Sequence, residues 1–346
     1  MRWFPPARIF RWDDIPLTGF FHTYLGLFVT QAFFHSLVAS FVSEIALKAW
    51  AVKDPAVRQK IFLVPIVAPV VLFPLFRLGN LDRGSTYFRL EAVFESERWL
   101  DVEIGGIRPV VAGLVLVFGI TSLVFLFQEL IPILRNYVES GRSERTAHAR
   151  DWADVPAVRA AMEALPVNPP RVFVVEDGGF LIFSTTGRNG AVYLSSALPE
   201  TLATEELRCA VAHEIAHVIR ARHPLLVAVY LLRALLFFNP IALMEFRRAV
   251  QEEEKVCDDL AVSLTGDRRG LADALRKLYL PPEEPLADGA RKSRKTAEEI
   301  EEHSHRLNIE SRISILDSGY EPDAVGKWLV PAAVVVATVA INYLVL

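Results

Sequence analysis

The hydrophobic positions of this chain gather in long runs that alternate with charged segments. Four runs approach or exceed the length needed to cross about 30 Å of hydrocarbon, and they cover residues 19–47, 61–76, 109–134 and 329–346. The second run is the shortest and contains three prolines, so we expect a kinked span whose flanking Lys60 and Arg77 extend to the membrane surface. The pattern predicts a mainly α-helical membrane protein with about four transmembrane helices.

A fifth apolar stretch, residues 224–246, differs from these four. Arg233 lies in its middle, where a charge at the bilayer centre would be costly, and the pair Asn239-Pro240 can end a helix. We therefore expect a membrane-associated or re-entrant hairpin at this position. A buried core helix of the domain between the third and fourth spans is the alternative.

The segment between the third and fourth spans, residues 135–328, is predicted to form a separate α+β domain. Its pattern gives helices over 154–165 and 204–218 and short strands at 171–175 and 191–195. Within it, residues 281–306 combine prolines with a basic and an acidic run, which predicts a mobile linker because such a composition cannot bury a core. The chain thus divides into an amino-terminal membrane region (1–134), this domain, and a carboxyl-terminal span (329–346).

The distribution of Lys and Arg gives an orientation. Residues 48–60, between the first two spans, hold four basic residues and one acidic residue, which favours the cytoplasm. The loop 77–108 has nearly equal numbers of basic and acidic residues, so it is better placed outside. We therefore expect residues 135–328 in the cytoplasm, although three arginines near the amino terminus favour the opposite orientation.

Residues 213–217 read His-Glu-Ile-Ala-His. Positions four apart lie on one face of a helix, so His213 and His217 can direct their imidazoles at one metal ion. Glu214 is then placed to act as general base toward water at that metal. Two acidic residues just upstream and apolar residues at helical spacing favour a helix here. The pattern predicts a zinc hydrolase with one Zn²⁺ per chain.

A catalytic zinc site needs a third protein ligand and leaves the fourth position to water. The acidic segment 251–259 supplies candidates, and Glu254 and Asp258 again lie four residues apart. We interpret Glu254 as the third ligand and Asp258 as an acceptor that orients a ligand histidine. The alternative is a solvated acidic helix face.

These residues together resemble a known family. The motif at 213–217, then Phe238-Asn239-Pro240, then Glu254-x-x-Cys257-Asp258 are similar to the membrane metallopeptidases of the BlaR/MecR antibiotic-sensor type. More distantly they resemble the HtpX and CAAX-prenyl-protease group. The resemblance covers roughly residues 165–320. Sensor-type proteins continue into a large extracellular ligand-binding domain, whereas this sequence ends at Leu346.

The resemblance implies a gluzincin-type endopeptidase fold in the inner membrane of a prokaryotic cell, with a protein or peptide substrate. It implies His213, His217 and Glu254 as zinc ligands and Glu214 as general base. Sensor-type relatives cut themselves in the cytoplasmic peptidase region, so the linker 281–306 is a candidate site of self-cleavage. A solvated charged loop is the alternative there.

Two further site assignments follow from the chemistry. In peptidases of this kind the strand before the motif helix offers its edge to an extended substrate, and we expect Ala191-Val192-Tyr193-Leu194-Ser195 to be that edge, with an ordinary paired strand as the alternative. A positioned donor should stabilise the oxyanion, and Arg312 or Arg306 is the candidate.

The favoured function is a membrane-bound zinc endopeptidase of regulated proteolysis or signal transduction. Quality control of membrane proteins, as in the HtpX group, is the enzymatic alternative, and a non-catalytic membrane scaffold is the alternative of another class. The net charge of −4 gives no reason to expect a nucleic-acid partner. The bilayer, the substrate and a second copy of the chain are the expected partners.

Overall fold

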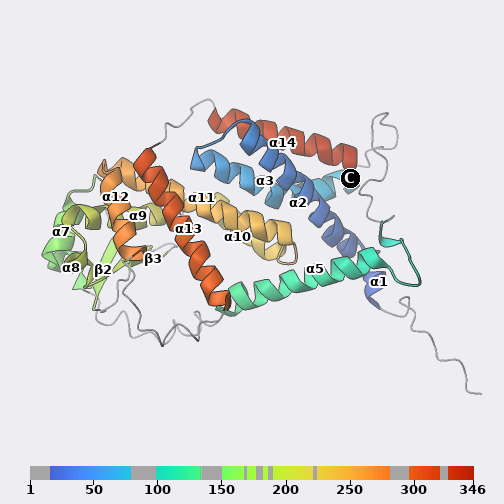
Figure 1. Ribbon diagram of the computed structural model, residues 1–346, viewed down its shortest axis with the longest axis horizontal. Helices are drawn as coiled ribbons and strands as arrows, with labels where there is room; N and C mark the ends of the chain where they lie inside the picture. Colours follow the sequence, from blue (N-terminus) through green and yellow to red (C-terminus); the bar gives the residue numbers. More distant parts are fainter. Residues whose placement is uncertain are drawn as a thin grey trace, which may run out of the picture.

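The computed structural model describes residues 16–78, 99–132, 134, 150–166, 170–176, 182–185, 190–220, 224–280, 296–319 and 326–346. Two main hydrophobic cores lie along one long axis of the molecule (Figure 1). One core is in a bundle of apolar helices, and the other is between a small sheet and a set of amphipathic helices. Helix α11 (Pro240–Thr265) joins them, because Ala242 and Ala249 belong to the first core and Ala261 to the second.

Four helices of the bundle are long and apolar enough to cross a membrane, as the sequence predicts: α2 (Tyr24–Ala49), α3 (Pro55–Leu78), α5 (Pro109–Phe125) with its π-helical continuation η3 (Leu126–Leu130), and α14 (Gly326–Val345). The short helix α1 (Pro16–Phe21) precedes them. Large apolar side chains remain exposed on the bundle, among them Phe41, Leu116 and Val336. Such a surface fits hydrocarbon rather than water. Most of the predicted outer loop, residues 79–98, lies outside the described residues.

Helix α3 is continuous through its three prolines, and serines of α2 compensate for two of them. A proline lacks an N–H, so Pro65 and Pro69 each leave the carbonyl four residues earlier without its helical donor. The Ser43 hydroxyl donates to Ile61 O at 3.4 Å, and the Ser36 hydroxyl donates to Pro65 O at 2.8 Å. These bonds meet the requirement that backbone groups inside a bilayer be satisfied within the protein.

The apolar stretch 224–246 folds back on itself, because the helix breaks at Asn239-Pro240. Helix α10 (Pro224–Leu235) ends before a turn, and α11 begins at Pro240 with the Asn239 side chain accepting from the N–H groups of Ile241 and Ala242. The Asn239 amide also donates to Ala32 O and Ser36 Oγ in the middle of α2, at 3.1 and 3.0 Å. The tip of this hairpin therefore lies inside the helix bundle.

The charge of Arg233 in α10 is compensated within the protein. Its guanidinium is 2% exposed, donates to Glu129 Oε1 at 2.7 Å, and lies over the ring of Phe125. Elsewhere α10 presents apolar side chains outward, with Val227, Tyr230, Leu231 and Leu235 all more than half exposed. This exposure does not fit the alternative of a buried core helix.

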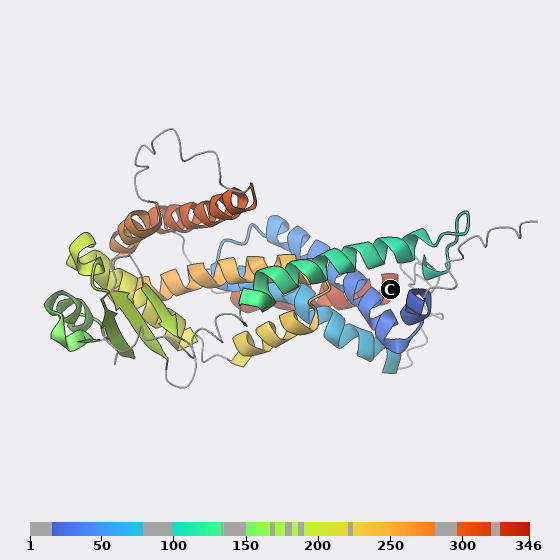
Figure 2. The same cartoon turned by 90° about the horizontal axis from the view of Figure 1, so that it is seen from below.

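The second core lies against a four-stranded sheet of order β1-β2-β4-β3. The strands are β1 (Arg150–Asp151), β2 (Arg171–Val175), β3 (Ile182–Thr185) and β4 (Ala191–Ser195). The helices are α7 (Pro156–Glu163), after the 3₁₀ turn η5 (Trp152–Asp154), then α8 (Leu198–Thr201), α9 (Thr204–Arg220), α12 (Arg268–Tyr279) and α13 (Thr296–Ser318). Figure 2 shows the sheet at the end of the molecule opposite α5. This part is α+β, as the pattern predicts.

The prediction that residues 191–195 form an edge strand is wrong. Strand β4 pairs in parallel with β2, in the register Val172 with Val192, and antiparallel with β3, in the register Phe183 with Tyr193. Both sides of β4 are therefore occupied. Among the described residues, β3 is the edge strand on this side of the sheet. Its hydrophobic pattern in the sequence is weak because the strand is short and half polar.

The predicted linker 281–306 is also shorter than expected. Residues 281–295 lie outside the described residues, but α13 begins at Thr296 and takes in the acidic run. Glu and Ala have high helix propensity, so a Glu-rich segment that cannot form a core can still extend a helix that packs elsewhere. Helix α13 packs on α12 and α11 through Ile309, Ile313 and Leu316.

Candidate metal centre

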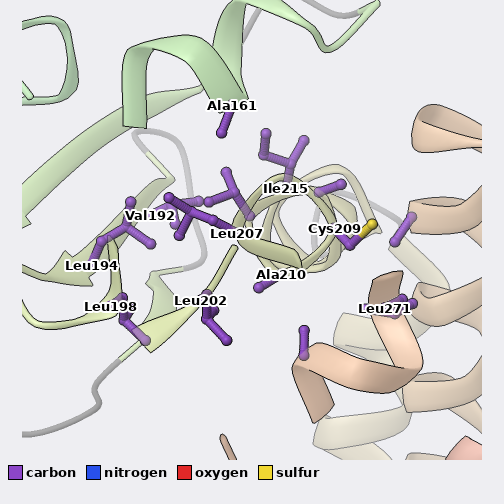
Figure 3. Packing of buried hydrophobic residues seen from close by; sticks show 14 of the residues in the cluster. Ala161, Val192, Leu194, Leu198, Leu202, Leu207, Cys209, Ala210, Ile215 and Leu271 are labelled. Carbon is purple, nitrogen blue, oxygen red and sulfur yellow. The ribbon is translucent and has the colours of Figure 1, made fainter. Parts of the chain in front are cut away.

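Helix α9 carries the His-Glu-x-x-His pattern, and its packing directs the motif. Leu207, Val211 and Ile215 are almost fully buried in the second core. Figure 3 shows Leu207 and Ile215 on the side of α9 that meets Val192 of the sheet. Because His213 and His217 lie on another face of the same helix, they are turned toward α11. The buried apolar face thus fixes the direction of the two imidazoles.

Helix α11 brings Glu254 to these histidines. The Nε2 atoms of His213 and His217 are 3.1 Å apart, and the Glu254 carboxylate lies 3.6 Å from the first and 3.5 Å from the second. Among the described residues these three form the one group of His, Cys, Asp and Glu side chains with donor atoms close enough to share a metal. The sequence-based interpretation of Glu254 agrees with this geometry.

The donor set fits a zinc ion. Ligand atoms about 2.0–2.1 Å from a tetrahedral centre are separated by about 3.3 Å, and the three measured separations scatter around that value. Two imidazoles and one carboxylate are also the ligand set of many catalytic zinc sites. The side chains are mostly shielded, with His213 10% exposed, His217 24% and Glu254 27%, which leaves one side open.

Asp258 and Arg312 support the ligands from behind. Asp258 Oδ1 lies 3.0 Å from His213 Nδ1, the nitrogen that does not face the metal position. Burial alone would raise the pKa of Asp258, but the Arg312 guanidinium outweighs it and holds that pKa below its ordinary value. Asp258 is therefore a carboxylate that can accept from Nδ1, which leaves Nε2 of His213 free to bind metal.

Arg312 comes from α13 and is almost completely buried. It donates to both oxygens of Asp258 at 2.7 Å and to Glu254 Oε2 at 3.0 Å, and its Nη2 lies 3.3 Å from His213 Nε2. The sequence offered Arg312 and Arg306 as equal candidates. The structure separates them, because Arg306 is more than half exposed and pairs with Glu310 along the surface of α13.

The second histidine has a different support. Its Nδ1 lies 3.4 Å from Cys257 Sγ, and burial, followed by the nearby charges of Glu253 and Glu254, raises the pKa of this thiol. Cys257 therefore remains a neutral partner of His217. Cys257 is fully buried in α11, one residue before Asp258.

Glu253 was missed by the sequence interpretation, which treated it as one of several acidic residues. It accepts from Arg220 Nε and Nη2 at 2.5 and 2.6 Å and from the Gln59 amide at 2.5 Å. Arg220 ends α9, and Gln59 lies in the first turns of α3. Glu253 thus connects both ligand-bearing helices to the membrane bundle, one residue from Glu254.

Tyr279 is a second residue that the sequence did not indicate. It ends α12, and its phenol has a raised pKa because of burial and then because of the Glu214 charge. Glu214 itself is 8% exposed on α9, beside the first ligand.

The motif helix α9 and a glutamate from α11 meet beside a bundle of membrane-crossing length, an arrangement that fits a membrane metallopeptidase. Residues 185–315 match the family described as BlaR1 peptidase M56. This match supports the resemblance to BlaR/MecR-type proteins over these residues. The matched segment contains the three ligand candidates, Glu214 and Arg312. Among curated proteins, none matches this chain.

Proposed function

We propose that this protein is a membrane-bound zinc endopeptidase that hydrolyses peptide bonds of a cytoplasmic or membrane protein in regulated proteolysis. The observation that carries the proposal is the convergence of His213, His217 and Glu254 at tetrahedral spacing, with Glu214 on the same helix. A scaffold has no need of this arrangement, whereas metal-assisted hydrolysis of an amide uses it.

Each side chain then has a role in peptide hydrolysis. A bound zinc ion would polarise the scissile carbonyl and lower the pKa of water to about 7. Glu214 takes the proton from the attacking water and returns it to the leaving amine. Arg312 is the candidate to stabilise the oxyanion, since its Nη2 lies 3.3 Å from His213 Nε2.

An extended substrate would bind along β3 rather than β4. Strand β3 packs against α9 and has its other side free of strands within the described part of the chain. A peptide added there would gain backbone hydrogen bonds of the β type. The expected mode of substrate binding is unchanged, but the strand that pairs with the substrate is the neighbouring one, Ile182–Thr185.

We further propose that the zinc site faces the cytoplasm, close to the membrane surface. Support comes from the basic segment 48–60, which the charge rule places on the inner side. Arg58 of this segment donates to Glu252 of α11 at 3.0 Å, two residues from Glu254. The exposed apolar face of α10 would lie in the bilayer beside the site.

The test uses the full chain purified from membranes, with Glu214→Gln and Glu254→Gln and with the exposed Glu200→Gln as control. Bound zinc is measured by elemental analysis and cleavage on a mixed protein substrate. Glu214→Gln should keep one zinc and lose about 10²- to 10⁴-fold in rate. Glu254→Gln should lose both zinc and activity. Equal rates for the parent and Glu214→Gln would contradict the mechanism.

The same samples distinguish the biological roles. Fragments ending between residues 281 and 295 in the parent, but not in Glu214→Gln, would establish self-cleavage in the predicted linker. Cleavage of added unfolded membrane protein without such fragments would favour the quality-control function. A parent protein without metal and without cleavage would favour the scaffold.

A further inference from the structure

A groove runs between α3 and α14 on the outside of the helix bundle. Its volume is about 410 Å³, and its walls are apolar, with Val67, Val71, Ala332 and Val335 among the lining residues. Pro331 also lines it, on the α14 side. Both helices are among the four long and apolar enough to cross a membrane, so the groove opens toward hydrocarbon.

The groove has one charged lining residue, and that residue is at one end. Lys60 lies in the second turn of α3, with its Nζ 4.1 Å from the ring centre of Trp328 and 3.4 Å from Lys327 O. Trp and Lys are typical of the level of the lipid headgroups. Lys327, exposed at the start of α14, adds a second positive charge at this end.

The length and volume of the groove fit a single acyl chain. From Lys60 to Leu72 the lining extends about 18 Å along α3, at 1.5 Å per residue. One leaflet of a bilayer has about 15 Å of hydrocarbon.

We propose that this groove binds an anionic phospholipid, with an acyl chain between α3 and α14 and the phosphate at Lys60. Basic pockets between transmembrane helices on the cytoplasmic side commonly bind anionic headgroups. Gln59, the neighbour of Lys60, donates to Glu253 beside the metal ligand Glu254. The lipid phosphate would therefore lie next to Gln59, whose side chain contacts Glu253 directly.

The first test measures lipid retention by native mass spectrometry of the full chain, with phosphatidylglycerol and phosphatidylcholine of the same acyl chains. The parent should retain phosphatidylglycerol preferentially, and Lys60→Gln should reduce that preference about fivefold. Lys48→Gln, an exposed lysine on the same side of the bundle, is the control and should leave it unchanged. Equal lipid preference in Lys60→Gln and Lys48→Gln would overturn the proposal.

The second test examines the acyl chain, and its first measurement uses the parent protein alone. Phosphatidylglycerol with a photoreactive group in its acyl chain should crosslink to peptides containing residues 60–72 and 328–339. Ala332→Phe, which fills the groove, should abolish this crosslink, whereas Val117→Phe on α5 should not. Crosslinks spread evenly over all four apolar helices would overturn the proposal. So would an Ala332→Phe protein that loses a dimer and retains its lipid, since the groove would then hold a second chain.

Discussion

Arg312 and Asp258 form a buried bidentate ion pair, with two hydrogen bonds of 2.7 Å between groups that are 5% and 4% exposed. The pair joins α13 to α11 directly behind His213. Two charges out of water are stable only when each is fully hydrogen-bonded, and Arg312 meets this condition through Asp258 and Glu254. The position of His213, the first candidate ligand, therefore depends on a helix that carries no candidate ligand itself.

The first prediction concerns Arg312→Lys. A lysine keeps the charge but cannot make the two parallel hydrogen bonds, so Asp258 and His213 should lose their fixed orientation. We expect zinc affinity to fall about 10- to 100-fold, measured by competition with a chelating dye. Arg306→Lys, on the exposed face of the same helix, is the control. An unchanged zinc affinity in Arg312→Lys would show that the ion pair does not position the ligand.

The second prediction concerns pH. Burial lowers the pKa of His213, but the nearby carboxylates of Asp258 and Glu254 have the larger effect. In the metal-free site they raise that pKa to about 9. Zinc must displace this proton, so its apparent affinity should rise with pH up to about 9, by up to tenfold per unit. Calorimetry in buffers of different ionisation enthalpy should show about one proton released per zinc at pH 7.5. Zinc binding without proton release at that pH would contradict the raised pKa.

The raised pKa of His213 also determines how the stability of the metal-free protein depends on pH. A histidine whose pKa is higher in the folded protein than its ordinary 6.5 contributes stability that is complete below about pH 6.5. That contribution is lost as the pH rises through about 9. The melting temperature of the chelated protein should therefore fall across this interval, and His213→Gln should remove this part of the pH dependence.

The third prediction concerns Glu253→Gln. The bidentate pair with Arg220 fixes the end of α9 against α11, and loss of the charge should leave Arg220 half-buried without its partner. We expect faster zinc dissociation, by about tenfold, with the ligands themselves unchanged. Glu205→Gln removes an exposed pair with Arg208 and should have little effect. Equal zinc dissociation rates in the two variants would refute the connecting role of Glu253.

The fourth prediction concerns Asn239→Ala. This change removes the cap of α11 and leaves the Ala32 carbonyl and Ser36 hydroxyl without their donor. The loss should be about 2 kcal/mol in the free energy of unfolding, measured by thermal melting in detergent. Asp267→Ala removes a cap of α12 that makes no contact with the bundle, and it should cost less. A larger loss for Asp267→Ala would argue against insertion of the hairpin tip.

The sequence predicted the apolar helices and the shared face of His213 and His217 because both depend on local spacing. Membrane-crossing length is a count of residues, and ligands four residues apart on a helix share a face whatever the surroundings. For the same reason the break at Asn239-Pro240 was predictable, since proline cannot continue a helix from the preceding turn.

What the sequence could not supply were relationships between distant segments. The order of the strands depends on which edges meet in space, so β4 was predicted as an edge although β3 covers it. Arg312 and Arg306 lie on one helix, and only the packing of α13 shows that Arg312 is the buried one. Glu253 is the middle residue of three consecutive glutamates, and the sequence around them does not distinguish one from another. In the structure the three carboxylates have different partners.

Helix α11 has a practical consequence for anyone who wants to study the peptidase in isolation. Its amino-terminal half packs against α2 and α3, and its carboxyl-terminal half carries Glu254 and Asp258. A water-soluble fragment cut before α11 loses a ligand, and a fragment that includes it exposes the surface that the bundle covers. Enzymology on this protein must therefore be done with lipid or detergent from the beginning.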